Sequence, residues 1–347
     1  MEVQARAPGK IILSGEHAVV HGSTAVAASI NLYTYVTLRF STPSDNQDSL
    51  KLELKDEGLD FSWSTTKLKE LFPESTEPQS PKPPSFSVES AKSIESLIEG
   101  LNIPEAKISI ASGVSAFLWL YTSIHGFKPA TVSFTSELPM GSGLGSSASF
   151  CVALAAALLA CTDFVSLDLK QQGWQSFQER QLDLVNKWAF EGEKIIHGKP
   201  SGIDNSVSAY ERTLRHPEAM AFVFNAVDSI SKELALVLQS TASDDVLSVT
   251  EKEEKIEELM EMNQGLLQSM GVSHVTIETV LRTTLKYKLA SKLTGAGGGG
   301  CVLTLLPTLL SGFVVQKVIA ELESCGFQCF TAEIGGKGVE INFDVSS

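Results

Sequence analysis

The stretch LPMGSGLGSSA at residues 138–148 joins a strand pattern to a long apolar segment. Before it, residues 130–136 are β-branched and alternate, which is typical of a half-buried strand. After it, residues 149–161 are almost entirely Ala, Leu, Val and Cys, which favours a buried helix. The order strand, glycine loop and helix N-terminus brings free backbone N–H groups and the positive end of a helix dipole together. The stretch therefore predicts an anion site that needs no lysine.

Two other nucleotide motifs fit this loop less well. A Walker A loop would require Gly-Lys-Ser/Thr after the glycines, and that sequence is absent. A dinucleotide fingerprint would suit the spacing of Gly141, Gly143 and Gly145, with Asp163 as the acidic residue, but no second strand pattern ends at Asp163. The hydroxyls of Ser146 and Ser147 lie where a metal-bound phosphate would sit. A glycine turn that merely packs would not explain them.

The bulk composition narrows the class of protein. A chain of 347 residues has room for about two domains. A formal net charge of −14 argues against nucleic acid or an anionic membrane as the main partner. The cysteine count of 5 is odd and none lies in a CxxC spacing, so reduced thiols are the simpler interpretation. With no signal-peptide pattern and no apolar run long enough to span a bilayer, we expect a soluble cytoplasmic protein.

The local patterns alternate between strand and helix. Strand patterns occupy residues 3–7, 11–13, 25–40 and 50–54, with Pro8-Gly9 as a turn between the first two. Helical spacing occupies residues 87–100, 114–125, 182–197 and 256–270, the last with one apolar face on an acidic helix. At the end of the chain, strand patterns at 301–306, 327–334 and 339–343 surround a helix at 313–324. This order predicts a β-α-β-β unit, as in ferredoxin-like domains.

Three further segments carry residues suited to chemistry. Residues 8–17 hold Lys10 and a Glu16-His17 pair, which we expect on tight turns beside strands. Residues 190–205 place Glu193 near a helix end and Asp204 on the following loop. Residues 294–300, TGAGGGG, form a second glycine-rich turn that leads into a strand. Each segment alone would suit a structural turn or an exposed acid, so their joint occurrence is the informative feature.

With the loop at 138–148, these segments resemble the GHMP kinases, and the match runs over nearly the whole chain. GEHAVVHG at 15–22 and the segment 191–205 are similar to the members that phosphorylate mevalonate to 5-phosphomevalonate with ATP. Galactokinases share the loop, but a Thr-Asp pair typically follows their Gly-Glu-His. The resemblance implies a two-domain α/β (α+β) fold with the active site in the cleft. The N-terminal domain, residues 1–210, would hold a mixed sheet and the phosphate loop, and residues 211–347 would form a ferredoxin-like C-terminal domain.

The resemblance also implies roles for individual residues. Asp204 would take the proton of the substrate hydroxyl, and Lys10 beside it would keep that carboxylate ionised. Ser146 and Glu193 would hold Mg²⁺ on the phosphates of ATP. Glu16, His17 and Ser201 would line the mevalonate pocket, and His197 would fix the loop before Asp204. The phosphates would be bound by the loop residues Pro139, Gly141, Ser142, Gly143, Leu144, Gly145, Ser146 and Ser147.

One segment departs from the family pattern. After residues 204–210 the family usually continues with a few tens of residues that form further strands, whereas here residues 211–217 lead at once into a helix. Loss of strands would leave unpaired edges and an exposed apolar helix face, and would open the site to water. The second hypothesis is therefore a short kinase-fold chain that binds nucleotide or a partner with little or no phosphate transfer. The family also includes dimers, so a homodimer is one expectation.

Overall fold

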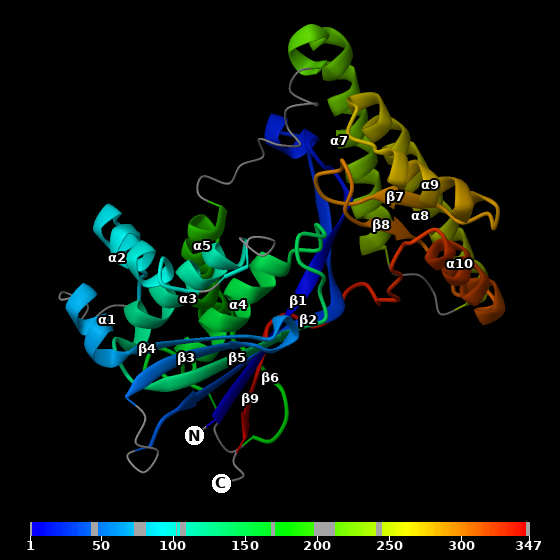
Figure 1. The fold of residues 1–347 in the computed structure, drawn as a ribbon. Coiled ribbons are helices and arrows are strands. Elements are labelled where there is room, and N and C mark those ends of the chain that lie inside the picture. The colour runs from blue at the N-terminus through cyan, green and yellow to red at the C-terminus, as the bar shows by residue number, and fades with distance from the viewer. Residues whose placement is uncertain are drawn as a thin grey trace.

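The chain forms two lobes, joined by a pair of long strands (Figure 1). The computed structural model describes residues 2–42, 48–72, 81–101, 103–104, 109–167, 171–197, 212–240 and 245–344. The first lobe is a seven-stranded sheet with helices on it, and the second is mainly helical with a two-stranded sheet. The two-domain α/β architecture predicted from the sequence is confirmed.

The large sheet combines strands from both ends of the chain. Its order is β4-β3-β5-β2-β1-β9-β6, and every pairing is antiparallel except that of β3 with β5. The strands are β1 (Glu2–Ser14), β2 (Val26–Phe40), β3 (Ser49–Leu54), β4 (Leu59–Ser64), β5 (Ala130–Ser136), β6 (Gln175–Ser176) and β9 (Glu340–Asp344).

Helix α4 (Ser146–Leu159) lies at the centre of the first lobe, because it is apolar on all sides. It packs beside α3 (Ser109–His125) and α5 (Glu179–His197), over one face of the sheet (Figure 1). The smaller helices of this lobe are α1 (Thr65–Leu71), α2 (Val88–Ile98) and η3 (Lys55–Glu57), whereas η1 (Ala18–His21) packs against the second lobe. The strand, glycine loop and helix expected around residues 138–148 are thus confirmed as β5, loop and α4.

The second lobe packs helices against a short hairpin. Its helices are α7 (Pro217–Gln239), α8 (Val246–Met270), α9 (Val275–Leu285) and α10 (Gly312–Ser324), and its strands are β7 (Ser291–Leu293) and β8 (Val302–Thr304). Helix α8 buries the apolar face expected from its sequence. Helix α7, which follows the segment where the sequence departs from the family, leaves large apolar side chains exposed, among them Phe222 at 74% and Leu236 at 68%.

The turn predicted at Pro8-Gly9 is wrong, because β1 runs unbroken through both residues. Its pairing with β2 shifts register between them, so a bulge absorbs the irregularity. Lys10 therefore lies within a strand. Gly9 serves a close approach instead, since a Cβ there would lie 2.5 Å from Leu138 Cδ2.

The β-α-β-β unit predicted at the end of the chain is also wrong. Residues 327–334 form no strand beyond a single bridge between Ile334 and Ile30. The strand expected at 339–343 exists as β9, but it pairs with β1 and β6 in the first lobe. Its alternating side chains fit the core of that lobe, where Ile341 is fully buried. The expected boundary after residue 210 lies outside the described residues and stays a prediction.

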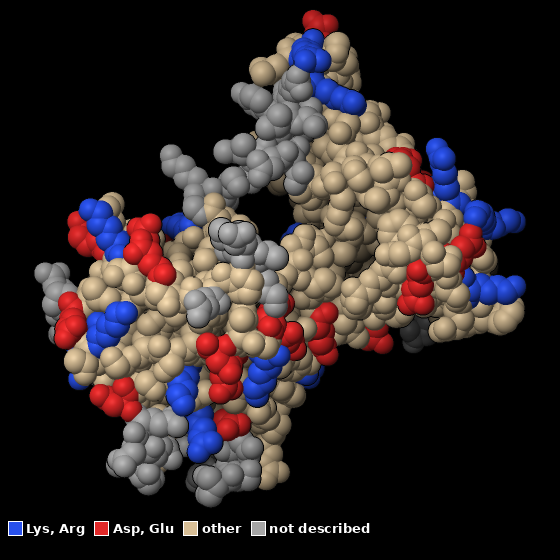
Figure 2. Space-filling model, in the orientation of Figure 1, with Lys and Arg blue, Asp and Glu red and all other residues tan. Residues whose placement is uncertain are grey.

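An apolar cluster holds the lobes together where the long strands enter the second lobe. Ile11 and Leu13 of β1 pack with Ile230 and Leu234 of α7. Leu138 and Leu144 belong to the same cluster, so the phosphate loop is tied to the lobe junction. Figure 2 shows the surface hollowed between the two lobes. Across the described residues, every helix is too short or too polar to cross a membrane.

Candidate active site

The three glycine-bearing segments meet at the lobe junction. The Lys10 backbone N–H donates to Leu144 O at 2.8 Å, which joins β1 to the phosphate loop. The Cys301 N–H donates to Ser142 O at 3.2 Å, which joins the second glycine turn to the same loop. A Cβ on Gly300 would lie 3.1 Å from Ser142 O, so this approach requires glycine. The structure thus brings together segments that lie far apart in the sequence.

The phosphate loop has the conformation of an anion cradle. Gly141, Gly143 and Gly145 have φ values of 69°, 83° and 77°, in the left-handed region that favours glycine. Gly145 caps α4 and makes no side-chain hydrogen bond, so the first N–H groups of the helix are not used by a cap. Together with the helix dipole, these groups suit the phosphates of a nucleotide.

Lys10 lies along this loop. Its Nζ donates to Gly143 O at 3.1 Å, and a Cβ on Gly145 would lie 2.8 Å from Lys10 Cγ. Burial lowers the pKa of the Lys10 ammonium, and the nearby Glu16 carboxylate opposes that shift. The loop therefore holds a partly desolvated cation at the place where charge must be neutralised.

Glu193 of α5 reaches the first turn of α4. The Ser147 hydroxyl donates to Glu193 Oε2 at 3.5 Å and lies 2.9 Å from His197 Nε2. Glu193 Oε1 is buried without a hydrogen-bond partner. Burial, followed by the charge of this carboxylate, raises the pKa of the neighbouring Cys151 thiol. An unpaired carboxylate oxygen beside a serine hydroxyl is a donor set that suits Mg²⁺, so the residues present fit that ion.

A cavity of about 760 Å³ opens beside the phosphate loop. The loop residues 138–141 and the serines at 146 and 147 line it, together with Phe134, Phe150 and His197. Cavities of this volume and mixed lining are typical of small-ligand sites. Ser146, predicted as a metal ligand, therefore faces an open space rather than the protein interior.

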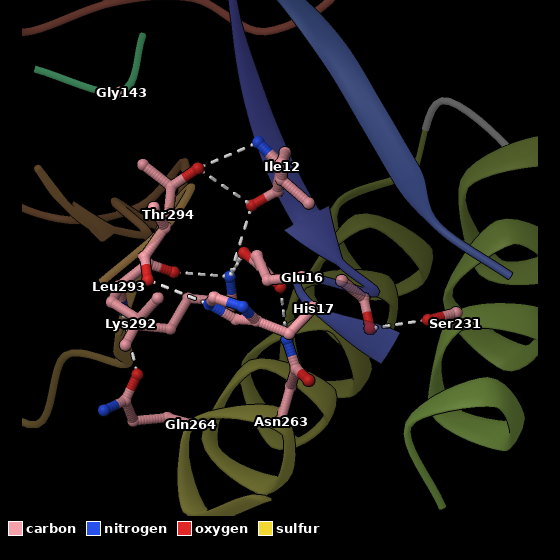
Figure 3. Close-up of polar contacts among 12 residues, drawn as sticks. Ile12, Glu16, His17, Gly143, Ser231, Asn263, Gln264, Lys292, Leu293 and Thr294 are labelled. Atoms are coloured by element: carbon pink, nitrogen blue, oxygen red, sulfur yellow. Dashed lines mark hydrogen bonds and ion pairs between the residues drawn. The ribbon is translucent and has the colours of Figure 1, made fainter. Parts of the chain in front are cut away.

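Glu16 and His17 lie just beyond Ser14, the last residue of β1, and Figure 3 shows their contacts. Glu16 is only 2% exposed and forms an ion pair with Lys292, so it lies beneath the cleft surface. His17 has a φ of 60°, and its Nε2 lies 2.8 Å from Ala296 O of the second glycine turn. Burial lowers the pKa of His17, opposed by the Ala296 carbonyl and Glu16. The other two predicted residues, Ser201 and Asp204, lie outside the described residues.

The structure adds two polar residues that the sequence did not single out, Lys292 and Asn263, and gives contacts to Thr294, the first residue of the second glycine turn. Thr294 Oγ1 accepts from Ile12 N–H at 2.9 Å and donates to Ile12 O at 3.2 Å (Figure 3). Lys292 and Asn263 both contact Glu16. One signal was available, since Lys292 is the charged residue nearest to the start of the second glycine turn. Its burial depends on tertiary packing and is not visible in the sequence.

In the part of the chain that the structure describes, clusters of His, Cys, Asp and Glu side chains give no further candidate metal site. Within the described ranges, no group of three such side chains is arranged to hold an ion. The candidate magnesium site therefore depends on serine hydroxyls beside Glu193. Magnesium commonly takes few protein ligands and keeps several waters, which agrees with so sparse a set.

Comparison with known proteins agrees with this geometry. The family model for the GHMP kinases N terminal domain matches residues 111–212, and that for the GHMP kinases C terminal matches residues 249–324. Mevalonate kinase of Arabidopsis thaliana is 59% identical over 384 aligned positions, covering 98% of this chain and 100% of that protein. Mevalonate kinase of Homo sapiens is 35% identical, covering 97% and 94%.

A solved structure is similar over the whole fold. The L. major mevalonate kinase in complex with R-mevalonate superposes with a TM-score of 0.61 at 16% identity, covering 99% of this chain and 96% of that one. The alignment with the Arabidopsis thaliana relative has 384 positions, more than the 347 residues of this chain, so it includes positions where this chain has a gap. The match nevertheless extends over nearly all of both chains. The chain belongs to the mevalonate kinase family of the GHMP kinases.

Proposed function

We propose that this chain transfers the terminal phosphoryl group of MgATP to the hydroxyl of mevalonate, forming 5-phosphomevalonate for isoprenoid and sterol precursors in the cytoplasm. The observation that carries the proposal is the meeting of three glycine-bearing segments around Lys10, with Glu193 beside the first turn of α4. Identity of 59% to a mevalonate kinase supports the choice of substrate. The relative in complex with R-mevalonate shares the fold.

The cradle at residues 139–147 would bind the phosphates of ATP through backbone N–H groups. The adjoining cavity of about 760 Å³ would receive the adenosine. Phosphoryl transfer requires positioning and neutralisation of charge more than covalent catalysis. The apolar walls supplied by Phe134 and Phe150 would exclude water, which strengthens electrostatic interactions in the site.

Ser146 and Glu193 would hold Mg²⁺, with Ser147 in contact with the same carboxylate. When bound, the ion neutralises charge on the phosphates of the nucleotide. Ser146 and Glu193 lie on α4 and α5, two packed helices of the first lobe. Their separation is therefore set by the rigid core of that lobe.

Asp204 would accept the proton of the mevalonate hydroxyl, and Lys10 would keep that carboxylate ionised. The hydrogen bond from Lys10 Nζ to Gly143 O supports this role, because it holds the ammonium beside the phosphate loop. His17 and Ser201 would complete the substrate side of the cleft, with the buried Glu16 beneath it. The His17 ring would be held in this position by its hydrogen bond to Ala296 O of the second glycine turn.

An assay that couples ADP release to mevalonate addition tests this function, with Asp204→Asn as the matched variant. We expect the unsubstituted chain to turn over and Asp204→Asn to lose at least about 100-fold in kcat while its affinity for MgATP changes little. A folded chain that binds MgATP without releasing ADP would contradict the proposal and leave the binding-only hypothesis. Near-normal turnover by Asp204→Asn would overturn only the role of that residue.

A further inference from the structure

Lys292 of β7 is fully buried, an unusual position for a lysine. Its ammonium forms an ion pair with Glu16 and donates to Ile12 O at 3.2 Å and to Leu293 O at 2.6 Å (Figure 3). A lysine has three donor protons, so all three find acceptors. Burial lowers the pKa of Lys292, and the Glu16 charge opposes that shift. A buried ion pair is a poor source of stability, since desolvation offsets its attraction.

The partner, Glu16, lies in a turn that the backbone alone does not favour. Gly15 has a φ of 100° and His17 a φ of 60°, so both residues adjoining Glu16 are in the left-handed region. A non-glycine residue in that conformation requires support from its surroundings. Glu16 supplies such support, because its carboxylate is held by Lys292 and also accepts from Asn263 Nδ2 at 3.2 Å. Helix α8, strand β7 and the end of β1 therefore meet at this carboxylate.

Lys292 also acts on β1, two residues from Lys10. It bonds to the carbonyl of Ile12, while Thr294 bonds to both polar groups of the same residue. The pairing of β1 with β2 is interrupted between Ile12 and Ser14, so this is where the strand most needs another anchor. Lys10 in turn bonds to the phosphate loop at Leu144 and Gly143. The contacts run continuously from Lys292 to the loop.

We propose that Lys292 is a positioning residue: through Glu16 it fixes the turn at residues 15–17, and thereby sets His17 and Lys10 relative to the phosphate loop. The inference rests on the proposed phosphate transfer. It assigns no contact between Lys292 and either substrate, because the ammonium is enclosed by protein. The pair acts as one unit, so removal of either charge removes the same support.

A double-mutant cycle tests this unit, with the variants Glu16→Gln, Lys292→Met and both together. We expect each of the three to lower kcat by about 100-fold and to change the KM for ATP by less than about threefold, because the cradle remains. In the Glu16→Gln background, adding Lys292→Met should change kcat by less than about threefold. Lys286→Met is the control, since it breaks an exposed ion pair with Glu321 in the same lobe and should leave kcat within about twofold.

Lys292→Met alone leaves Glu16 buried without its partner and can fail to fold, and the comparison of Glu16→Gln with the double variant then decides. Losses that add in the double variant, or a rise in the KM for ATP as large as the fall in kcat, would overturn the proposal. Amide hydrogen exchange separates this inference from the proposed function. We expect faster exchange at residues 12–17 and 294–300 in the folded double variant, whether or not the parent chain turns over. Unchanged exchange in both segments would contradict the positioning role.

Discussion

At the scale of single residues, Gly145 and Lys10 illustrate how the site depends on close approach. A side chain on Gly145 would meet Lys10 Cγ at 2.8 Å, in a backbone conformation with a φ of 77°. The glycine is therefore needed twice, for its conformation and for the space that Lys10 occupies. Gly126 differs from Gly145 in this respect. It also has a positive φ, of 62°, but a Cβ there would meet no other atom, so only its backbone conformation favours glycine.

We expect Gly145→Ala to lower kcat by at least about 100-fold, because the new methyl group displaces Lys10 from the loop. Gly126→Ala is the matched control. It introduces similar backbone strain of about 1–2 kcal/mol without a contact. Steady-state kinetics and urea unfolding of both variants check the prediction. Equal effects of the two substitutions on kcat would show that strain alone matters.

Glu193 has a buried carboxylate oxygen without a hydrogen-bond partner, so Glu193→Gln should weaken the use of magnesium. We expect the Mg²⁺ concentration for half-maximal activity to rise by about tenfold or more. Glu191→Gln is the control on the same helix, since Glu191 pairs with Lys194 at the surface. A magnesium titration at fixed ATP measures both. Equal magnesium requirements would remove Glu193 from the metal site.

His17 should make stability depend on pH. Burial holds its pKa below the ordinary value of 6.5, so the unfolded chain takes up a proton before the folded chain does. The contribution of this residue to folding is therefore present above pH 6.5 and is lost as the pH falls. Urea unfolding between about pH 7.5 and about pH 5.5 should show a smaller loss of stability for His17→Gln than for the parent. Parallel curves would contradict the assignment.

At the scale of elements, β1 organises the molecule through the edge that β2 leaves free. That edge pairs with β9 at residues 2–6, binds the phosphate loop at Lys10 and binds Thr294 at Ile12. One strand therefore connects the sheet, the anion cradle and the second lobe. Arg6 secures the first of these contacts, since its guanidinium packs over the rings of Tyr33 and Trp174 and donates to Glu340 at 2.6 Å.

Arg6→Met should lower the free energy of unfolding by about 2 kcal/mol, because it leaves the Glu340 carboxylate buried without its main partner. The Glu340 side chain is only 1% exposed, whereas that of Arg6 is 21% exposed. Lys337→Met is the control. The exposed Lys337 ammonium lies 3.6 Å from the same carboxylate, so its removal should lower the free energy of unfolding by no more than about 0.5 kcal/mol. Urea unfolding of the two variants makes the comparison, and similar losses would refute it.

Local patterns predicted the elements well where hydrophobic periodicity and length agreed. The helix after the glycine loop and the strand before it are both present, as is the apolar face of α8. Two wrong predictions share one physical cause: a local pattern does not specify which other segment of the chain it pairs with. The 339–343 pattern correctly indicated a strand but not the sheet that it joins, and Pro8-Gly9 indicated a turn where β2 holds the chain straight.

The candidate site was predictable to the extent that its residues belong to glycine motifs. Lys10 and the loop at 139–147 are brought together as expected, and Glu193 reaches the first turn of α4. Glu16 lies deeper than a pocket-lining role suggests, because Lys292 neutralises it below the surface. The pairing joins residues 276 positions apart, so sequence spacing gives no hint of it.

At the scale of the whole molecule, the lobes share both a core and a sheet. The cluster around Leu138 and Leu144 includes side chains of α7, and β9 returns from the second lobe to the first. Part of the apolar surface of each lobe is therefore buried against the other lobe. We infer that the two lobes unfold together, although chains of this length commonly unfold in stages.

The positions of the tryptophans allow a direct check. All 4 tryptophans, at 63, 119, 174 and 188, precede the second lobe, whereas far-ultraviolet circular dichroism also reports α7 to α10. We expect the urea transitions from tryptophan fluorescence and from circular dichroism to coincide. Addition of a non-hydrolysable MgATP analogue at about 100 times its Kd should raise the free energy of unfolding obtained from either probe by about 2.7 kcal/mol. Separate midpoints would show that the lobes unfold independently.

The place of β9 has a consequence for biosynthesis. Figure 1 shows the red end of the chain beside its blue beginning, with β9 between β1 and β6. Because β9 is translated after every other described element, β1 must wait on the ribosome with one edge unpaired for residues 2–6. A nascent chain halted before residue 340 would expose that edge to other chains, so completion of translation itself protects this fold from aggregation.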